Sequence, residues 1–167
     1  MPALQSGAIY YFDIVQDYPA IGGVVEFSRT LFAELQRRYG DRLKSVRELA
    51  SELGFADASM PYLHRERLIA ERLACVDPRS TFFFPNFQSP VPGHARGGGP
   101  RVVNVVHDVQ FAYLPELFSA ERLGALHRTF EETRENADEI IFISEAARRQ
   151  FLQVFGAPRR HRIRLIH

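Results

Sequence analysis

The sequence has little of several features that mark other classes of protein. Among its 167 residues there is one cysteine, Cys75, which excludes an intrachain disulfide and a zinc site made of cysteines. The formal net charge of +1 gives no argument for bulk binding of nucleic acid. No apolar run approaches the roughly 18 residues that span a bilayer, and no basic-then-apolar signal opens the sequence. These absences predict a cytoplasmic protein with no membrane-spanning segment and no nucleic-acid partner.

What the sequence does contain is the composition of an ordinary folded domain. Hydrophobic residues make up 46% of the chain and charged residues 25%, which are the proportions of a globular protein. A chain of this length corresponds to one domain, and it can bury about two thirds of the surface that its unfolded form exposes. We therefore expect a single domain over residues 1–167 with a normal hydrophobic core.

Short apolar runs alternate with segments of helical periodicity. A mostly β-branched run follows the breakers Gly97 to Pro100, as expected for a buried strand of a parallel sheet. Strands are predicted at Ala8–Val15, Thr81–Phe84, Val102–Val106, Ile140–Ile143 and Arg162–Ile166. Helices are predicted from Val24 to near Tyr39, from Ala120 to Asn136 after a Ser119 cap, and from a Ser144 cap through Phe155. This order predicts an α/β fold, a doubly wound, Rossmann-like parallel sheet with helices on both faces.

Residues 41–76 fit this order least well. A second strand should follow the first helix, but Leu43 to Val46 is a poor candidate for it. Ser45 and Glu48 have the spacing of a capping box, which predicts a helix there instead. Ser59 before Met60-Pro61 indicates another helix start, since proline is tolerated in a first turn. We expect this region to be mainly helical.

Polar or glycine residues follow several of the predicted strands. They are Gly22-Gly23, Asn86 with nearby Gln88, His107-Asp108 and Ser144-Glu145. In an open α/β sheet, ligands bind outside the carboxyl ends of the strands. We therefore expect these residues to open onto one crevice and to form the functional site. The remaining histidines show no metal-ligand spacing, so no metal is expected.

Each of these residues also has a purely structural interpretation. Asp108 would cap the backbone of the loop after its strand, with His107 a satisfied residue at the sheet edge. The glycine pair would supply a positive φ for a tight turn, which is the commoner role of such pairs. Ser144 and Glu145 would form an ordinary helix cap. The glycines lack the G-x-G-x-x-G spacing, so a dinucleotide site is not expected.

The residues around the predicted crevice resemble those of a known family. The segment HDVQFAYLPELFS, followed by ADEIIFISEAARRQF and HRIRLIH, resembles the amino-terminal half of retaining GT-B glycosyltransferases of family 4 (group 1). Gly22-Gly23 resembles the first glycine turn of that family, and the run from Phe84 to Phe87 resembles a strand-end motif in many members. The resemblance covers nearly the whole chain and is weakest in residues 41–76.

The resemblance implies an enzyme of two Rossmann-like domains that face each other across a cleft. The amino-terminal domain mainly binds a glycan or lipid-linked acceptor, and the carboxyl-terminal domain, which this chain lacks, binds the nucleotide-sugar. The family needs no bound metal, and the nucleotide-sugar is a co-substrate. A lipid-linked acceptor would bring peripheral contact with the inner membrane face.

By the same resemblance, His107 and Asp108 would be the catalytic pair. His107 would lie beside the transferred sugar, and Asp108 would hold the imidazole or bind an acceptor hydroxyl. Gly22 and Gly23 would allow close approach of the donor diphosphate, and Asn86, Gln88, Ser144 and Glu145 would border the acceptor.

Two other functions remain open from the residues alone. One is a non-catalytic doubly wound module that binds a ligand or partner at the same crevice. The other is a His-Asp metal phosphohydrolase, which we set aside because it needs further histidines and carboxylates on helices.

Overall fold

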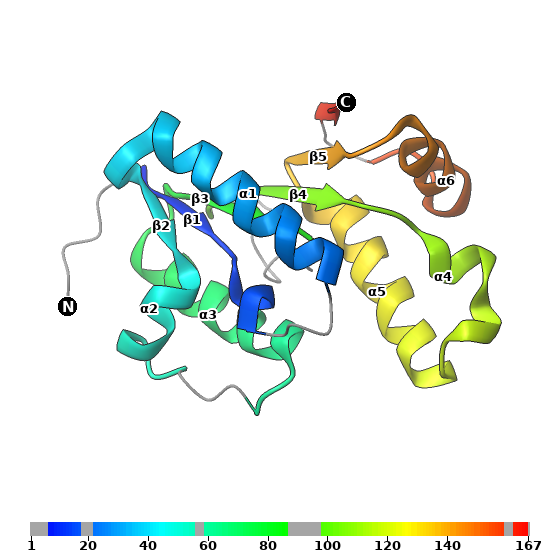
Figure 1. Ribbon diagram of the computed structural model, residues 1–167, viewed down its shortest axis with the longest axis horizontal. Helices are drawn as coiled ribbons and strands as arrows, with labels where there is room; N and C mark the ends of the chain where they lie inside the picture. The colour runs from blue at the N-terminus through cyan, green and yellow to red at the C-terminus, as the bar shows by residue number, and fades with distance from the viewer. Residues whose placement is uncertain (1–6, 18–21, 56–58, 87–97, 159–161, 167) are drawn as a thin grey trace.

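A computed structural model describes residues 7–17, 22–55, 59–86, 98–158 and 162–166. These residues form a six-stranded sheet in which every neighbouring pair is parallel, in the order β2-β1-β3-β4-β5-β6 (Figure 1). The strands are β1 (Ile9–Tyr11), β2 (Leu43–Ser45), β3 (Thr81–Phe84), β4 (Arg101–Val106), β5 (Glu139–Phe142) and β6 (Arg162–Leu165). The predicted fold class, a doubly wound α/β sheet, is confirmed.

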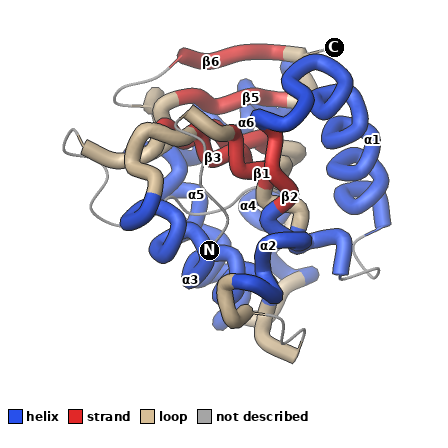
Figure 2. Tube along the Cα trace, turned by 90° about the vertical axis from the view of Figure 1, so that its left-hand side faces the viewer, coloured by secondary structure: helices blue, strands red, loops and turns tan. Residues whose placement is uncertain are grey.

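The longer helices connect these strands. They are α1 (Gly22–Tyr39), α2 (Val46–Glu52), α3 (Tyr62–Val76), α5 (Ala120–Asn136) and α6 (Glu145–Phe155). A short helix, α4 (Gln110–Tyr113), and three 3₁₀ turns, η1 (Ile14–Asp17), η3 (Gly40–Arg42) and η5 (Pro115–Leu117), complete the order. Figure 2 shows α1 on one side of the sheet and α3 and α5 on the other, so helices cover both faces as expected. None of the described helices is both long enough and apolar enough to cross a membrane.

Serine caps begin three of the helices. The Oγ atoms of Ser45, Ser119 and Ser144 accept hydrogen bonds from the backbone N–H three residues later, at 3.1, 3.3 and 3.0 Å. Gly156, with φ of 77°, ends α6, as its sequence position predicted. The sequence predicted the caps at Ser119 and Ser144 correctly, and it also predicted both ends of α5.

The first strand is shorter than predicted. Only Ile9–Tyr11 of the run Ala8–Val15 is in the sheet, because the chain turns at Asp13 into η1. The Asp13 carboxylate accepts hydrogen bonds from Ser45 Oγ at 2.7 Å and from the Arg47 backbone N–H at 2.8 Å. The buried carboxylate thus ties the end of β1 to the junction of β2 and α2. Apolar periodicity cannot register a bond between residues so far apart in sequence.

The prediction for residues 41–76 was partly wrong. Leu43–Ser45 does form the second strand, on the edge of the sheet, paired in parallel with β1. Three residues with Lys44 in the middle carry too little apolar pattern to identify a strand, and the pairing with β1 decides the outcome. The helix at Ser45 is confirmed, whereas α3 begins after Pro61, its N-cap, and not at Ser59.

Smaller differences occur at two other places. The segment after β4, where no helix was predicted, contains α4. Strand β5 runs from Glu139 to Phe142 and not from Ile140 to Ile143, so Ile143 follows it. The first difference adds a short helix between β4 and α5, and the second shifts a strand by one residue. Neither changes the order of the predicted strands and helices.

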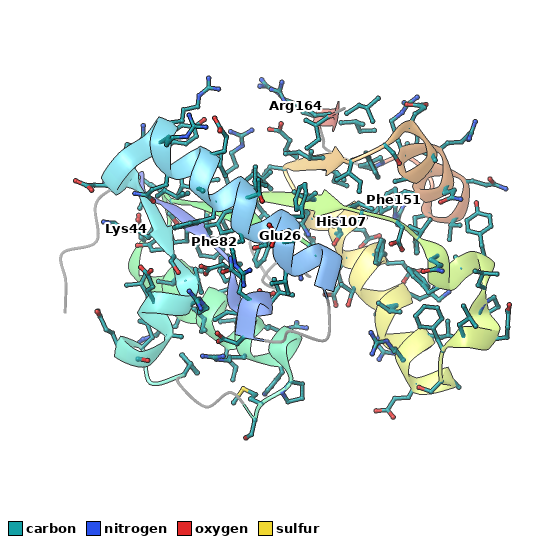
Figure 3. All side chains as sticks on the ribbon, viewed as in Figure 1. Glu26, Lys44, Phe82, His107, Phe151 and Arg164 are labelled. Atoms are coloured by element: carbon teal, nitrogen blue, oxygen red, sulfur yellow. The ribbon has the colours of Figure 1, made fainter. Side chains whose placement is uncertain are left out.

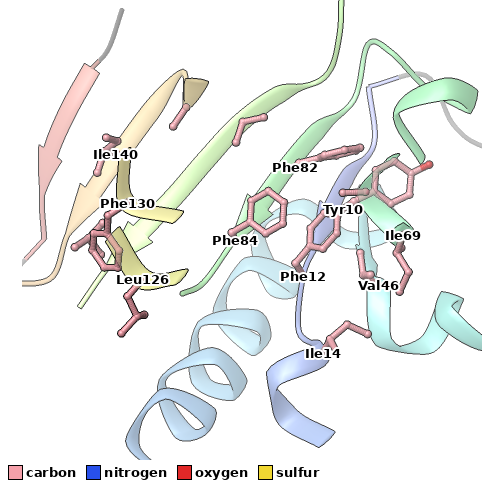
Figure 4. Close-up of a cluster of buried hydrophobic side chains, with 14 of the residues drawn as sticks. Tyr10, Phe12, Ile14, Val46, Ile69, Phe82, Phe84, Leu126, Phe130 and Ile140 are labelled. Carbon is pink, nitrogen blue, oxygen red and sulfur yellow. The ribbon is translucent and has the colours of Figure 1, made fainter. Parts of the chain in front are cut away.

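The main core lies on one face of the sheet and is rich in phenylalanine. Alternate residues of the strands point into it, including Tyr10, Phe12, Phe82 and Phe84, all fully buried (Figure 4). The rings of Phe12 and Phe84 have centroids 4.1 Å apart. Helices α2 to α6 supply the facing side chains of this core, and α1 supplies none of them.

Helix α1 is fixed to the opposite face through Tyr11. The Tyr11 hydroxyl donates a hydrogen bond to the Ser28 carbonyl at 2.8 Å, and the ring lies 5.3 Å from that of Phe32. Tyr11 makes both contacts, whereas its neighbour Tyr10 points into the core on the other face. Successive residues of one strand therefore pack on both faces of the sheet. The start of α1 is thereby held beside the carboxyl ends of the strands.

A buried acidic residue of α3 lies near the end of β1. Glu66 is completely buried, and neither of its carboxylate oxygens has a hydrogen-bond partner among the described residues. Burial, and then the charge of Asp13, raise the pKa of Glu66 well above its usual value of 4.5, against a smaller opposing effect of Arg65. Burial therefore favours the protonated, neutral form of Glu66 in the folded chain.

We expect Glu66→Gln to make the stability of the chain less dependent on pH. Because the pKa is raised in the folded state, the native chain loses stability as pH rises above about 4.5 toward the folded-state pKa. Glutamine has nearly the same shape and does not ionise, so the variant should gain stability over the native chain as pH rises. The measurement is the urea unfolding midpoint of both chains from pH 5 to pH 8. A difference that does not grow with pH would contradict this account.

Candidate functional site

The site is built at the edge where all six parallel strands end. In the order β2-β1-β3, the chain leaves β1 for β2 on one side and returns to β3 on the other. This reversal is the topological switch point, outside which open α/β sheets bind their ligands. Residues after β1, β3 and β4, together with the start of α1, surround it.

His107 is the best-positioned titratable residue at this edge. Its Nε2 atom lies 2.8 Å from the Pro85 carbonyl oxygen at the end of β3. A carbonyl can only accept, so Nε2 carries a proton, and Nδ1 is left without a partner among the described residues. The ring also meets Phe27 of α1 edge-on, with centroids 4.7 Å apart and planes at 83°. Figure 3 shows His107 beside α1.

This environment keeps the imidazole neutral. Burial lowers the pKa of His107 from its usual 6.5, and the hydrogen bond to Pro85 and the charge of Asp108 oppose this only in part. A neutral ring with a proton on Nε2 presents a lone pair on Nδ1. His107 can therefore accept a hydrogen bond, or a proton, from a hydroxyl group of a ligand.

Asp108 does not hold the imidazole in this structure. Its Oδ1 atom accepts a hydrogen bond from the Gln110 backbone N–H at 3.0 Å, so the carboxylate starts α4. The orienting role predicted for Asp108 belongs to the Pro85 carbonyl, and the structural interpretation of Asp108 as a cap is correct. The side chain is exposed and can still reach a ligand through its other oxygen.

Gly22 and Gly23 form the first residues of α1 and do not form a separate turn. Positive φ is not the reason for Gly23, which lies outside the positive-φ glycines Gly7, Gly40, Gly54 and Gly156. A Cβ atom built on Gly23 would have no atom of the other described residues within 4 Å. The glycine therefore leaves open space beside the free N–H groups of a helix start, which favour anions.

Asn86 follows Pro85 at the end of β3 and is almost completely buried. Neither its side-chain nitrogen nor its side-chain oxygen has a hydrogen-bond partner in the described part of the chain. A desolvated amide without partners costs free energy, so its presence needs an explanation, of which a bound ligand or water is one. The predicted placement of Asn86 at this edge is confirmed, and Gln88 lies outside the described residues.

Ser144 and Glu145 stand at the same edge but already have structural roles. Ser144 caps α6, and the Glu145 carboxylate binds the Arg148 guanidinium at 2.5 and 2.8 Å. Glu145 is in turn the main cause of the raised pKa of Arg148. This is the helix cap that the structural interpretation predicted. Of the residues expected at the crevice, His107, Asp108, Asn86 and the glycine pair are the ones with groups left for a ligand.

The sequence did not identify the two groups that contact His107, which are the Pro85 carbonyl and the Phe27 ring. Phe27 lies within the helix predicted from Val24 to near Tyr39, and nothing in the sequence marked it as a neighbour of His107. The Pro85 carbonyl carries no signal in a sequence, because it is a backbone group that any residue supplies. Among the described residues, no group of three or more His, Cys, Asp or Glu side chains is arranged to hold a metal ion.

Comparisons of this chain with protein-family models, with curated proteins and with solved structures give no match. The candidate site is therefore defined by its own geometry.

Phe27→Ala should raise the pKa of His107. The phenyl ring removes water from the imidazole, and burial is the largest cause of the lowered pKa, so its removal moves the pKa back toward 6.5. The pKa is measured by following the imidazole resonances in an NMR titration. Asp108→Asn is the control, and we expect it to change the pKa in the opposite direction, because the Asp108 charge stabilises the protonated ring. A native pKa at or above 6.5 would contradict the geometry.

Proposed function

We propose that this chain is the acceptor-binding domain of a retaining GT-B glycosyltransferase that transfers a sugar from a nucleotide-sugar to a glycan or lipid-linked acceptor. The proposal is supported most by one observation: a neutral imidazole whose Nδ1 atom has no partner among the described residues, beside a helix start where those residues leave space at Gly23. The sequence segments around His107 and Ser144 resemble that family. The enzyme would act in the cytoplasm, with peripheral contact to the membrane when the acceptor is a lipid.

The position of the site supports a ligand with both hydroxyl and anionic groups. His107 offers a hydrogen-bond acceptor, and Asn86 offers both a donor and an acceptor of the kind that binds sugar hydroxyls. The first turn of α1 contains no acidic residue, so nothing on this turn opposes an anion. A sugar diphosphate combines these two chemistries in one molecule.

In the proposed mechanism, His107 stays neutral and acts as a hydrogen-bond acceptor. Nδ1 would accept a hydrogen bond from a hydroxyl of the transferred sugar or of the acceptor, while the bond from Nε2 to Pro85 fixes the plane of the ring. A fixed acceptor costs little reorganisation when charge develops in the transition state. Asp108 would bind a hydroxyl of the acceptor through its free oxygen. The first N–H groups of α1, opened by Gly22 and Gly23, would approach the donor diphosphate.

The proposal includes a second domain that binds most of the nucleotide-sugar. The open side of the described edge consists of strand ends and loops, which in a two-domain enzyme would face the second domain. The donor would bind mainly to that domain and touch this one only near α1 and His107. Ser144 and Glu145 would border the acceptor through their backbone and exposed atoms.

In the two-domain enzyme, we expect His107→Ala to lower kcat by about 10²–10³, the effect of losing one well-placed polar contact in a transition state. The variant also loses the bond to Pro85 and the contact with Phe27, so the domain should be destabilised by about 1–2 kcal/mol. Turnover and the denaturation midpoint are measured on the same preparation. The matched control is His127→Ala, since His127 is exposed on α5 and also meets a phenylalanine ring edge-on. Normal turnover in folded His107→Ala would remove His107 from the site.

The chain of 167 residues alone should show no measurable sugar transfer and only weak affinity for nucleotide-sugars. The reason is that the proposed donor site belongs mainly to the other domain, and this domain offers one helix start and one imidazole. Isothermal titration with UDP-glucose and GDP-mannose measures the affinity, and release of the nucleotide measures transfer. Micromolar binding of either donor by this chain would contradict the division of roles between the two domains.

A further inference from the structure

The two faces of the sheet are covered unequally. Side chains of α2, α3, α4, α5 and α6 join the core on one face, and α1 contributes none to that core because it lies on the other. Sheets made only of parallel strands are normally buried on both faces. Of the described helices, α1 alone therefore has to cover a face six strands wide.

Helix α1 crosses this face at an angle and leaves part of it without cover from the described residues. Near its start, Phe27 meets His107 at the carboxyl end of β4, and toward its end Tyr39 lies with Ile9 and Leu43 at the beginnings of β1 and β2. The amino-terminal halves of β4 and β5 are consequently not beneath the helix. Figure 1 shows α1 running obliquely over the strands.

The uncovered area is a groove of about 310 Å³ with an apolar floor and wall. Phe83, Val103 and Ile141, from three adjacent strands, form the floor, and Leu35 and Tyr39 of α1 form the wall. We call the hollow lined by these five residues the α1 groove. Tyr39 is 37% exposed, a large aromatic surface left facing water.

The width of the α1 groove suits one further helix. Adjacent strands lie about 4.8 Å apart, so β4 and β5 are roughly 10–14 Å from β1, over which α1 packs. Helices pack with their axes about 8–10 Å apart. A helix laid over β4 and β5 would therefore contact the side of α1 and the floor of the groove together.

The rim of the groove carries an excess of positive charge. Arg101, Arg162 and Arg164 are on β4 and β6, and two of them, Arg101 and Arg164, donate to the carboxylate of Glu139 on β5. Glu139 is nearly buried between them, while its two partners are half exposed and Arg164 stands at the outer edge (Figure 3). Nearby, the Asp138 carboxylate accepts a hydrogen bond from the Val102 backbone N–H at 2.8 Å. Arg42 lines the groove with Arg101, whereas Arg162 lies in a neighbouring hollow with Arg101 and Asp138. Neither Arg42 nor Arg162 has an ion-pair partner in the described residues, so cationic groups outnumber carboxylates around the groove.

We propose that the α1 groove binds an amphipathic helix of a partner polypeptide that carries acidic side chains beside its apolar stripe. The apolar stripe would cover Phe83, Val103 and Ile141. The carboxylates would pair with Arg42 at the groove and with Arg162 in the hollow beside it. This would complete the cover of the sheet on the α1 side, as parallel sheets require. The inference does not depend on the proposed glycosyltransferase activity, because the groove lies toward the opposite end of the strands from His107.

The test uses the whole chain and two synthetic peptides of about 18 residues, long enough to form a helix in water. Both peptides have leucine at positions i, i+3, i+4 and i+7, and they differ only in having glutamate or lysine on the flanks of this stripe. Binding is measured by fluorescence anisotropy and located by methyl NMR. We expect saturable binding of the acidic peptide, weakened by salt, with shifts of the Val103 and Ile141 methyl groups, and no such binding of the basic peptide.

Two variants of the groove and two matched controls decide the location. Tyr39→Ala and Arg162→Glu should each weaken binding about tenfold or more. Tyr113→Ala and Arg149→Glu make the same changes at exposed residues outside the groove, on α4 and α6, and should leave binding unchanged. All four positions are exposed, and circular dichroism and the melting temperature confirm that each variant folds.

Three results would overturn the inference. They are no saturable binding of the acidic peptide, equal binding of both peptides, and binding that the groove variants do not weaken. A fourth would assign the groove to a second copy of the chain: a dimer in analytical ultracentrifugation that Tyr39→Ala dissociates and the acidic peptide does not.

Discussion

The parallel direction of all six strands is the constraint on which the rest of this structure depends. Since every strand runs the same way, every residue that follows a strand arrives at the same edge of the sheet. Groups 22 residues apart in sequence, His107 and the Pro85 carbonyl, become hydrogen-bonded neighbours for this reason. The helix that leaves β1 must also begin at this edge, which brings the first turn of α1 against the end of β4.

The same constraint explains why the site holds a neutral histidine. An imidazole at the end of a central strand lies between the neighbouring strand end and the helix above it, so it loses water on two sides. The loss of water outweighs the nearby charge of Asp108, and the pKa falls. The Pro85 carbonyl can only accept a hydrogen bond, so the ring nitrogen that faces it, Nε2, carries the hydrogen. The opposite effect acts on Glu66, where burial keeps a carboxyl group protonated. Both groups are neutral because the fold removes water from them.

Parallel pairing also sets what the two faces need. A strand in such a sheet presents apolar side chains in both directions, as Tyr10 and Tyr11 do, one toward the core and one toward α1. The core face is filled by phenylalanine rings from strands and helices. The other face has one helix, set obliquely, and therefore an apolar groove with arginines at its rim. The candidate site at the carboxyl ends of the strands and the groove on the α1 face therefore both result from the parallel sheet.

The sequence by itself determined the class of fold and the placement of most elements. Val102–Val106, Thr81–Phe84, the caps at Ser119 and Ser144 and the stop at Gly156 depend on local periodicity and local hydrogen bonds, which a sequence states directly. It also placed Asn86 and His107 at one edge, because that follows from strand direction alone. Only the tertiary structure decided the short edge strand Leu43–Ser45, the turn of the chain at Asp13, the partner of His107 and the incomplete cover beside α1. Each of these depends on a contact between residues far apart in the chain, often through a backbone group, and such contacts exist only once the sheet has formed.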